Sequence, residues 1–536
     1  MAPLKSLLTL ANLALLVSGT AIPANSVTVS GKPPAGASAP VPEAFVSYSL
    51  EFAFFPDFAG NRSSPNKFSD NLLSNIGNII GTKPYIRVGG NTQDYAIFNE
   101  SLPVATLGIV NPARSPDYPT TLHIGPSYFE SYSTWPNTKF IHGFNLGQAG
   151  NNTIGWESLV QTVPYACKAL EGGKLLWWEY GNEPDLYSTS AQGPVRPPSW
   201  NETTYVAQWL EGSRAIKAGI AKACPNLLSK SSYGYLAPSF AGTNGHLKPL
   251  TTWQDGLDAD NDIKLISSHN YIGGATQPGV TLQGTLMNHT MSVNSATTQA
   301  NLGNALSYTG IPFILGEMNS LYNQGAPGLS NSFGAALWGI DFNLYCASLG
   351  IRRTHMHQGT DYRYASWQPI ETSKTAKGTK PPYYGNIAVA AMMGDLTRNK
   401  VQIANIPLST SYDAAYAAYE NGRLARVIVI NMREYNYTVN GTSDVPNPVK
   451  RPSQTYTFQL PTNVFGEAKV QTLHANGSDA ITGITWDGIS YNYELDDGKP
   501  VRLRNITTGE RVPVWAGKVS VNVQDSSAVI LNVPLL

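Results

Sequence analysis

The sequence predicts a parallel (β/α)8 barrel followed by an antiparallel β-sandwich, and three observations support this fold class. Between residues 45 and 396, short apolar runs alternate with amphipathic segments of helix length, as in parallel strands joined by crossover helices. Most of these runs end in Gly, Asn, His or Glu, and barrels build their sites at the carboxyl ends of strands. Residues 397–536 lack helical periodicity and contain short β-rich runs instead.

Six apolar runs are the strand candidates of the first region, and helices are expected between them. Apolar residues at helical spacing over 159–170 and 333–344 predict two of these helices, although Pro164 leaves the start of the first one open. An open doubly wound sheet is the alternative architecture. The barrel is favoured because no G-x-G-x-x-G turn follows the first strands. The six runs are 83–90, 139–147, 174–182, 263–271, 311–319 and 351–359.

The first 44 residues have two parts. Lys5 precedes the apolar stretch SLLTLANLALLVSGTA, which predicts a signal peptide over residues 1–21, cut near Ala21, and hence a secreted, extracellular protein. No later stretch has the length of a membrane span, so no membrane partner is expected. Residues 22–44 contain the strand-like SVTVSG, which we expect to cross over and join the C-terminal sandwich.

The C-terminal region, residues 397–536, has the turn signals of an all-β domain. Asn421-Gly422 between two strand-like runs is a strong hairpin signal. Further short runs, such as QTYTFQL and VSVNVQDSSAVILNV, continue the β pattern to the end of the chain.

Composition excludes some partners and favours others. Lys plus Arg equals Asp plus Glu at 36 each, so no nucleic-acid partner is expected. Charged residues are 13% of the chain, against an average of about 25%, and neutral hydrogen-bonding side chains take their place. A monomer is expected. Nine N-x-[ST] sequons predict a glycoprotein: Asn61, Asn99, Asn151, Asn201, Asn288, Asn436, Asn440, Asn476 and Asn505.

Three cysteines allow one disulfide at most. Cys167 and Cys224 fall near the ends of the helices that follow the third and fourth strands, which are neighbours in a barrel. We therefore predict a Cys167–Cys224 bridge, with Cys346 buried and free inside its helix.

The stretch WWEYGNEPD places one carboxylate at a strand end. Pro184 disfavours helical angles at the residue before it, so we expect Glu183 to be held in an extended conformation at the mouth of the barrel. Glu179 lies within the strand and is interpreted as a buried structural carboxylate. Asp185 is expected to cap the segment that follows.

Glu317, at the end of the apolar run in IPFILGEMNS, is the predicted partner of Glu183. Counting the repeats, Glu183 ends strand 4 and Glu317 ends strand 7, which face each other across a barrel mouth. Two carboxylates about 5 to 5.5 Å apart are what retaining glycoside hydrolysis requires, one as nucleophile and one as acid/base.

Several motifs together resemble a known family. GNEPD followed by LGEMN resembles the strand-4 and strand-7 signatures of clan A glycoside hydrolases. SYSLEFAFFPDFAGN, YIRVGGNTQD, WWEYGNEPD, SSHNY and HQGTDYRYASWQP are similar to motifs of β-glucuronidases of glycoside hydrolase family 79, the family of heparanase. The resemblance runs from about residue 45 to the C-terminus and implies a barrel with a C-terminal β-sandwich. It also implies Glu183 as acid/base and Glu317 as nucleophile.

The resemblance further implies substrate-binding roles. Asn182 would bind the sugar 2-hydroxyl, Tyr271 would orient the nucleophile, and Glu51 would hold sugar hydroxyls at the closed end of the pocket. Tyrosine hydroxyls would bind the glucuronate carboxylate, with Tyr322 as one donor and either Tyr364 or Tyr362 as the other.

The expected function is a secreted, retaining exo-β-glucuronidase acting on glycans that end in β-linked glucuronic acid or its 4-O-methyl form. No cofactor or metal is expected, because His355 and His357 lie two apart on a strand without a third ligand. The alternatives are a clan A glycosidase of another specificity, such as a β-glucosidase or β-xylosidase, and a non-catalytic glycan-binding protein.

Overall fold

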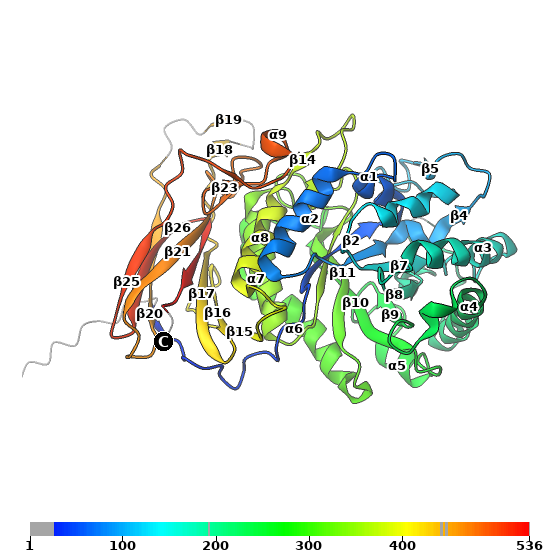
Figure 1. The fold of residues 1–536 in the computed structure, drawn as a ribbon, viewed down its shortest axis with the longest axis horizontal. Coiled ribbons are helices and arrows are strands. Elements are labelled where there is room, and N and C mark those ends of the chain that lie inside the picture. Colours follow the sequence, from blue (N-terminus) through cyan, green and yellow to red (C-terminus); the bar gives the residue numbers. More distant parts are fainter. Residues whose placement is uncertain (1–25, 191–192, 440–442, 445–448, 535–536) are drawn as a thin grey trace, which may run out of the picture.

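The computed structural model describes residues 26–190, 193–439, 443–444 and 449–534. A closed barrel of parallel strands with its surrounding helices lies beside a C-terminal β domain (Figure 1). The predicted fold class is confirmed. The expected signal peptide, residues 1–21, lies outside the described residues.

Eight parallel strands close the barrel in the order β10-β11-β12-β2-β3-β7-β8-β9. Six of them overlap the expected runs, with β10 and β11 extending beyond theirs, and β2 and β9 lie outside the expected runs. β9 contains Pro238, and a proline inside an apolar run weakens its strand signal. The strands are β2 (Val46–Glu51), β3 (Ile86–Gly89), β7 (Phe140–Phe144), β8 (Leu175–Tyr180), β9 (Tyr235–Phe240), β10 (Ile263–Gly274), β11 (Phe313–Tyr322) and β12 (Thr354–Gln358).

Helices cover the outside of the barrel. α3 begins at Thr153, where the Asn152 side chain accepts a hydrogen bond from the N–H of Gly155, so Pro164 lies inside this helix and does not mark its start. The helices are α1 (Phe55–Ala59), α2 (Lys67–Ile80), α3 (Thr153–Leu170), α4 (Glu202–Ala223), α5 (Pro249–Gln254), α6 (His289–Ala305), α7 (Phe333–Ser348) and α8 (Pro381–Met393).

A disulfide joins two of these helices at their carboxyl ends. Cys167, in the last turn of α3, is bonded to Cys224, the residue directly after α4, which is the expected pairing. Cys346 is free and buried within α7.

A small three-stranded sheet follows β3 and extends the barrel at its mouth. Its strands are β4 (Ala96–Phe98), β5 (Thr106–Ile109) and β6 (Thr121–Ile124), in the order β4-β6-β5. The loop between β5 and β6 reaches the cavity described below with Arg114, Tyr118 and Thr120.

The C-terminal strands form one twelve-stranded sheet. Strands from both of its ends contribute to a single apolar core, so the sheet folds over itself. β16 and β17 form the hairpin expected at Asn421-Gly422. The strands are β15 (Val401–Asn405), β16 (Asp413–Glu420), β17 (Arg423–Asn431), β20 (Ser453–Gln459), β21 (Gly466–His474), β22 (Thr485–Trp486), β23 (Ile489–Ser490), β24 (Val501–Arg502), β25 (Arg511–Trp515), β26 (Lys518–Gln524) and β27 (Ser527–Asn532).

The first described strand, β1 (Ser26–Thr28), is the twelfth member of this sheet. It pairs in parallel with β20, so the N-terminal segment crosses to the C-terminal domain, as expected. The core of the barrel also continues without a break into β15, β16 and β17, which ties the two parts together. No helix in the described ranges is long and apolar enough to cross a membrane.

Candidate active site

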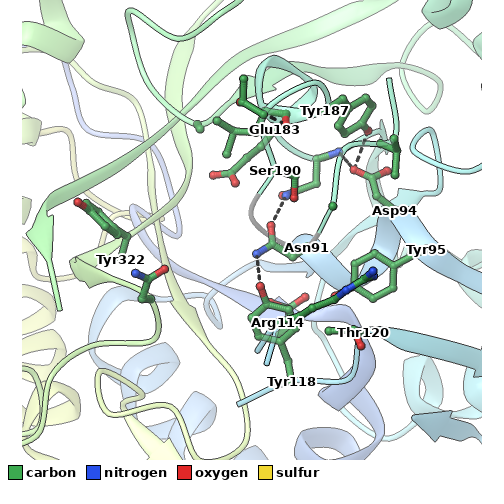
Figure 2. A pocket seen from close by; sticks show the side chains of 18 of the residues that line it. Asn91, Asp94, Tyr95, Arg114, Tyr118, Thr120, Glu183, Tyr187, Ser190 and Tyr322 are labelled. Atoms are coloured by element: carbon green, nitrogen blue, oxygen red, sulfur yellow. Dashed lines mark hydrogen bonds between the residues drawn. The ribbon is translucent and has the colours of Figure 1, made fainter. Parts of the chain in front are cut away.

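A cavity of about 970 Å³ opens at the carboxyl ends of the barrel strands. This is the face on which barrel enzymes place their sites. All seven residues expected to act on or bind the sugar line this cavity, among them Glu183 and Tyr322 (Figure 2), whereas Tyr362, the alternative to Tyr364, does not. The expected residues that line it are Glu51, Asn182, Glu183, Tyr271, Glu317, Tyr322 and Tyr364.

Glu183 follows β8 in a backbone conformation that the sequence did not indicate. Its φ of 48° and ψ of 50° are left-handed, so the expected extended conformation is wrong. The turn is fixed on both sides, because the Glu183 N–H donates to the Ser239 carbonyl at 2.9 Å and its carbonyl accepts from Leu186 at 2.8 Å. A left-handed non-glycine residue is uncommon and is typical of functional sites.

Asp94 holds the turn that carries Asn182 and Glu183. One of its carboxylate oxygens accepts the Asn182 N–H at 2.8 Å and the Tyr187 hydroxyl at 2.6 Å. The other accepts two N–H groups, from Leu146 and Gly147, at the end of β7. Asp94 thus fixes the ends of neighbouring strands, and burial raises its pKa to about 6.

Asp185 does not cap the segment after Pro184, contrary to expectation. It is buried, and its carboxylate accepts the N–H of Ala241 beyond β9 at 2.9 Å. The proline and the left-handed turn before it point this side chain inward, toward the neighbouring strand.

Glu317 lies in the middle of β11, which continues to Tyr322 beside the slightly longer β10. The apolar run therefore ends before the strand does. Tyr271 on β10 donates its hydroxyl to one oxygen of Glu317 at 2.7 Å. The other oxygen accepts from Nη1 of Arg87 at 2.6 Å.

The two carboxylates are close and differ in electrostatic environment. One oxygen of Glu183 and one of Glu317 lie within 4.8 Å of each other. Burial and the nearby Glu317 raise the pKa of Glu183. Burial alone would raise the pKa of Glu317 too, but His357, Arg87 and the Tyr271 hydrogen bond lower it well below its ordinary value. The pair can therefore hold one proton, on Glu183, while Glu317 is ionised.

Arg87 and two histidines were not identified from the sequence as site residues. The buried Arg87 guanidinium also binds Glu179 at 2.8 Å and the Asn182 side-chain oxygen at 2.7 Å, so Glu179 is a structural ion-pair partner as expected. An arginine inside an apolar barrel strand, as in YIRVGG, is the signal that could have revealed it.

His269 and His357 each contact one of the site's carboxylates. His269 Nδ1 lies 2.9 Å from a Glu183 oxygen, and burial lowers the His269 pKa to about 4, which leaves the ring neutral. His357 Nε2 lies 3.3 Å from a carboxylate oxygen of Glu51, and His357 Nδ1 lies 3.6 Å from a carboxylate oxygen of Glu317. These carboxylates outweigh burial and raise its pKa.

Glu51 closes the inner end of the cavity. It is buried and accepts hydrogen bonds from the N–H and hydroxyl of Thr92. The Tyr362 hydroxyl donates to it at 3.1 Å, so Tyr362 lies behind Glu51 and outside the lining. Tyr364 lines the cavity next to Tyr271, with ring centroids 6.0 Å apart.

Tyr322 stands at the opposite wall from Arg114, at the end of β11 (Figure 2). It is 45% exposed and lines the cavity. The position therefore lets its hydroxyl reach a substrate, whereas the geometry of Tyr362 does not.

Ligand atoms of Glu183, His269 and Glu317 lie close enough together to surround a cation. Each is already engaged, however: Glu183 with His269, and Glu317 with the Arg87 guanidinium and the Tyr271 hydroxyl. A fixed guanidinium in contact with one ligand opposes a second cation, so the donor set suits acid–base chemistry better than metal binding.

Comparison with known proteins gives close relatives. A β-glucuronidase of Neurospora crassa is 57% identical over 505 residues, covering 90% of this chain and 90% of that protein. A β-glucuronidase of Aspergillus niger is 57% identical over 518 residues, covering 95% and 94%. The family model "Glycosyl hydrolase family 79 C-terminal beta domain" matches residues 415–530.

The fold has a solved counterpart. The crystal structure of a 4-O-α-L-rhamnosyl-β-D-glucuronidase from Fusarium oxysporum 12S has a TM-score of 0.74 at 24% identity, covering 95% of this chain and 100% of that one. At this identity the likeness supports the fold alone. The high identity to the Neurospora and Aspergillus enzymes over at least nine-tenths of their length shows that this chain is a glycoside hydrolase of family 79.

Proposed function

We propose that this chain is a retaining, exo-acting β-glucuronidase that removes terminal β-linked glucuronic acid, or its 4-O-methyl form, from glycans. The observation that carries the proposal is the pair of carboxylates, Glu183 and Glu317, with oxygens within 4.8 Å at the barrel mouth. A separation of about 5 to 5.5 Å fits nucleophilic attack by a carboxylate and leaves no room for a water between the two, as inversion would need. The relatives named above are β-glucuronidases.

The reaction follows from the two environments. Ionised Glu317 attacks the anomeric carbon while Glu183 gives its proton to the leaving oxygen, and the glycosidic bond breaks. Glu183, now ionised, takes a proton from water, whose oxygen attacks the anomeric carbon and releases Glu317. Arg87 and Tyr271 hold the nucleophile by both oxygens, so its direction of attack is fixed before substrate binds.

The closed inner end supports exo action. Glu51 and His357 line that end, and the Tyr362 hydroxyl supports Glu51 from behind, an arrangement that favours a sugar at the end of a glycan chain. Glu51 faces the sugar hydroxyls in this arrangement, and Asn182, held by Arg87, is placed next to Glu183 for the 2-hydroxyl.

The carboxylate of the substrate needs hydrogen-bond donors to replace its water. Tyr322 and Tyr364 supply hydroxyls on the cavity wall, and Tyr364 is the better second donor because Tyr362 already donates to Glu51. Neutral donors suit this position. A cation here would place a second positive charge near Glu317, which the Arg87 guanidinium already contacts.

A panel of aryl glycosides with β-glucuronide, β-glucoside and β-xyloside groups tests the assignment. We expect hydrolysis of the glucuronide at a kcat/KM far above the others, with the β-anomer of the sugar as the first product by NMR. A first product with α configuration would contradict retention. Faster glucoside or xyloside hydrolysis would establish another clan A specificity, and hydrolysis of none would indicate a non-catalytic glycan-binding protein.

We propose further that the protein is a secreted monomeric glycoprotein. A disulfide between Cys167 and Cys224 suits an oxidising compartment. Of the nine sequon asparagines, Asn288 is half-buried, Asn440 lies outside the described residues and the other seven are exposed. Recovery from culture medium, a mass shift on N-glycan removal and light scattering would test the three parts, and an unglycosylated intracellular product would contradict them.

A further inference from the structure

The cavity extends well beyond the space around the two catalytic carboxylates. Its volume of about 970 Å³ is at the upper end of the roughly 300–1,000 Å³ of pockets that enclose drug-sized ligands, more than one sugar ring fills. The inner end is closed by Glu51 and His357. The remaining space lies on the outer side and must hold something other than the glucuronic acid residue.

The chemistry of the site says which part of the substrate occupies this outer space. Glu183 gives its proton to the leaving oxygen, so the leaving group must extend past Glu183. The outer wall on that side comes from the loops that follow β3, β7 and β8. These loops contribute Arg114, Thr120, Gln148, Asn151, Leu186, Thr189, Ser190 and Gly193 to the lining.

Most of this outer wall is neutral and hydrogen-bonding, as a saccharide requires. Arg114 is the exception. It is the one arginine or lysine among the cavity-lining residues that the structure describes, and it lies on the far side of the cavity from Tyr322 (Figure 2). Its position thus separates it from Tyr322, one of the two tyrosines that would bind the glucuronate carboxylate.

Among the described residues, Arg114 has no ion-pair partner of the kind that Arg363 has. Arg363 binds both oxygens of Asp117 on the same loop, at 2.6 and 2.9 Å. Within the described ranges no carboxylate lies within 4.0 Å of the exposed Arg114 guanidinium. Nη1, Cζ and Nη2 of Arg114 are 3.8 to 3.9 Å from where a Cβ on Gly193 would stand, so the flat face of the guanidinium rests against that loop.

We propose that the outer part of the cavity is a leaving-group subsite in which Arg114 selects leaving saccharides that bear a carboxylate. A guanidinium with its face covered keeps its N–H edge for a planar, two-oxygen acceptor. This inference rests on the proposed function, because it needs Glu183 as acid/base. It adds that the natural leaving group is an acidic sugar unit, such as a second uronic acid.

A pair of matched substrates tests the subsite. 3-Carboxyphenyl and 3-carbamoylphenyl β-D-glucuronide have the same shape and differ in the charge of the leaving group. The ratio of kcat/KM between the two substrates is measured for the wild-type protein and for Arg114→Gln. Because the intrinsic reactivity of the substrates contributes equally to both ratios, it cancels when the two ratios are compared. We expect Arg114→Gln to lower the ratio about two- to fivefold, mainly through KM, as for an exposed ion pair. Added salt should lower the wild-type ratio as well.

Lys374→Gln is the matched control. Lys374 is an exposed cation that binds the Pro116 carbonyl of the same loop and does not line the cavity. Its removal should leave the ratio unchanged. An unchanged ratio in Arg114→Gln, an equal loss on both substrates, or the same change in Lys374→Gln would each overturn the subsite. If the wild type hydrolyses neither glucuronide, the proposed function fails instead.

Discussion

At the scale of single residues, the neighbours of Glu183 and Glu317 give the two glutamates different protonation states. Glu317 is held between a guanidinium and a tyrosine hydroxyl, whereas Glu183 faces a neutral histidine and a neighbouring negative charge. The same side chain therefore serves as an ionised nucleophile in one place and as a proton donor in the other. The roles can be read from the configuration of trapped products.

Azide separates the roles of Glu317 and Glu183. In Glu317→Ala, azide should take the place of the nucleophile and give the α-glucuronosyl azide. In Glu183→Ala, azide should attack the covalent intermediate and give the β-azide, with larger losses on poor leaving groups. NMR of the products checks both, and exchanged configurations would reverse the assignment.

The pH dependence follows from the two shifted pKa values. Glu183, with a raised pKa, must be protonated, so kcat/KM should fall as pH rises through that pKa, above the ordinary glutamate value near 4.3. Glu317, with a lowered pKa, must be ionised, so the acid limb should lie below that value. Glu183→Gln, assayed with an activated aryl leaving group, should lose the alkaline limb. A limb that persists would belong to another group.

Tyr322→Phe tests recognition of the substrate carboxylate. A hydrogen bond to a charged group contributes about 1.5 to 3 kcal/mol, and the half exposure of Tyr322 places it at the lower end, so kcat/KM on glucuronides should fall about tenfold. Weak glucoside activity should change little. Tyr412→Phe, similarly exposed and outside the cavity, is the control. Equal losses on both sugars would mean that Tyr322 only shapes the pocket.

At the scale of elements, the extension of β10 and β11 beyond the other strands supports the site. Both strands run past the nucleophile, so Tyr271 and Tyr322 stand on paired backbone and not on a loop. The register places Gly274 opposite Tyr322. Without a side chain at residue 274, the tyrosine ring can lie flat over the neighbouring strand.

Gly274→Ala should displace Tyr322 without unfolding the protein. The added Cβ would lie 2.4 Å from Cζ of Tyr322, at the free end of an exposed side chain that can move. We expect a loss on glucuronides close to that of Tyr322→Phe, and little further loss when the two are combined. Gly339→Ala, where nothing lies within 4 Å, is the control. Additive losses would show that Gly274 acts elsewhere.

The elements also show what the sequence could and could not reveal. Asn421-Gly422 predicts its hairpin because the turn is a local property of the backbone. The conformation of Glu183 could not be predicted, because hydrogen bonds to Ser239 and Leu186 overrule the preference set by Pro184. Arg87 was not identified for the same reason: its four partners come from β2, from β8 and the turn after it, and from β11, and they meet only in the closed barrel.

At the scale of the whole molecule, one covalent bond ties the ends of α3 and α4 on the outside of the barrel. Replacing both cysteines by alanine should lower the free energy of unfolding by about 2 to 4 kcal/mol, because the unfolded chain gains freedom in the opened loop. Activity per folded molecule should not change, since the bond is remote from the cavity lining. Denaturant unfolding checks the first statement and kcat/KM the second; an unchanged midpoint would contradict the assumed gain in freedom.

The pairing of β1 with β20 sets an order of events during synthesis. Residues 26–28 leave the ribosome before any strand of the barrel, yet their partners, residues 457–459, are made only after the entire barrel. The barrel can close as soon as β12 is available, whereas the edge of the C-terminal sheet waits for the last strands of the chain. The first strand therefore has no partner for most of translation, and its pairing links residues 26–28 to residues 457–459 only after the barrel strands have been made.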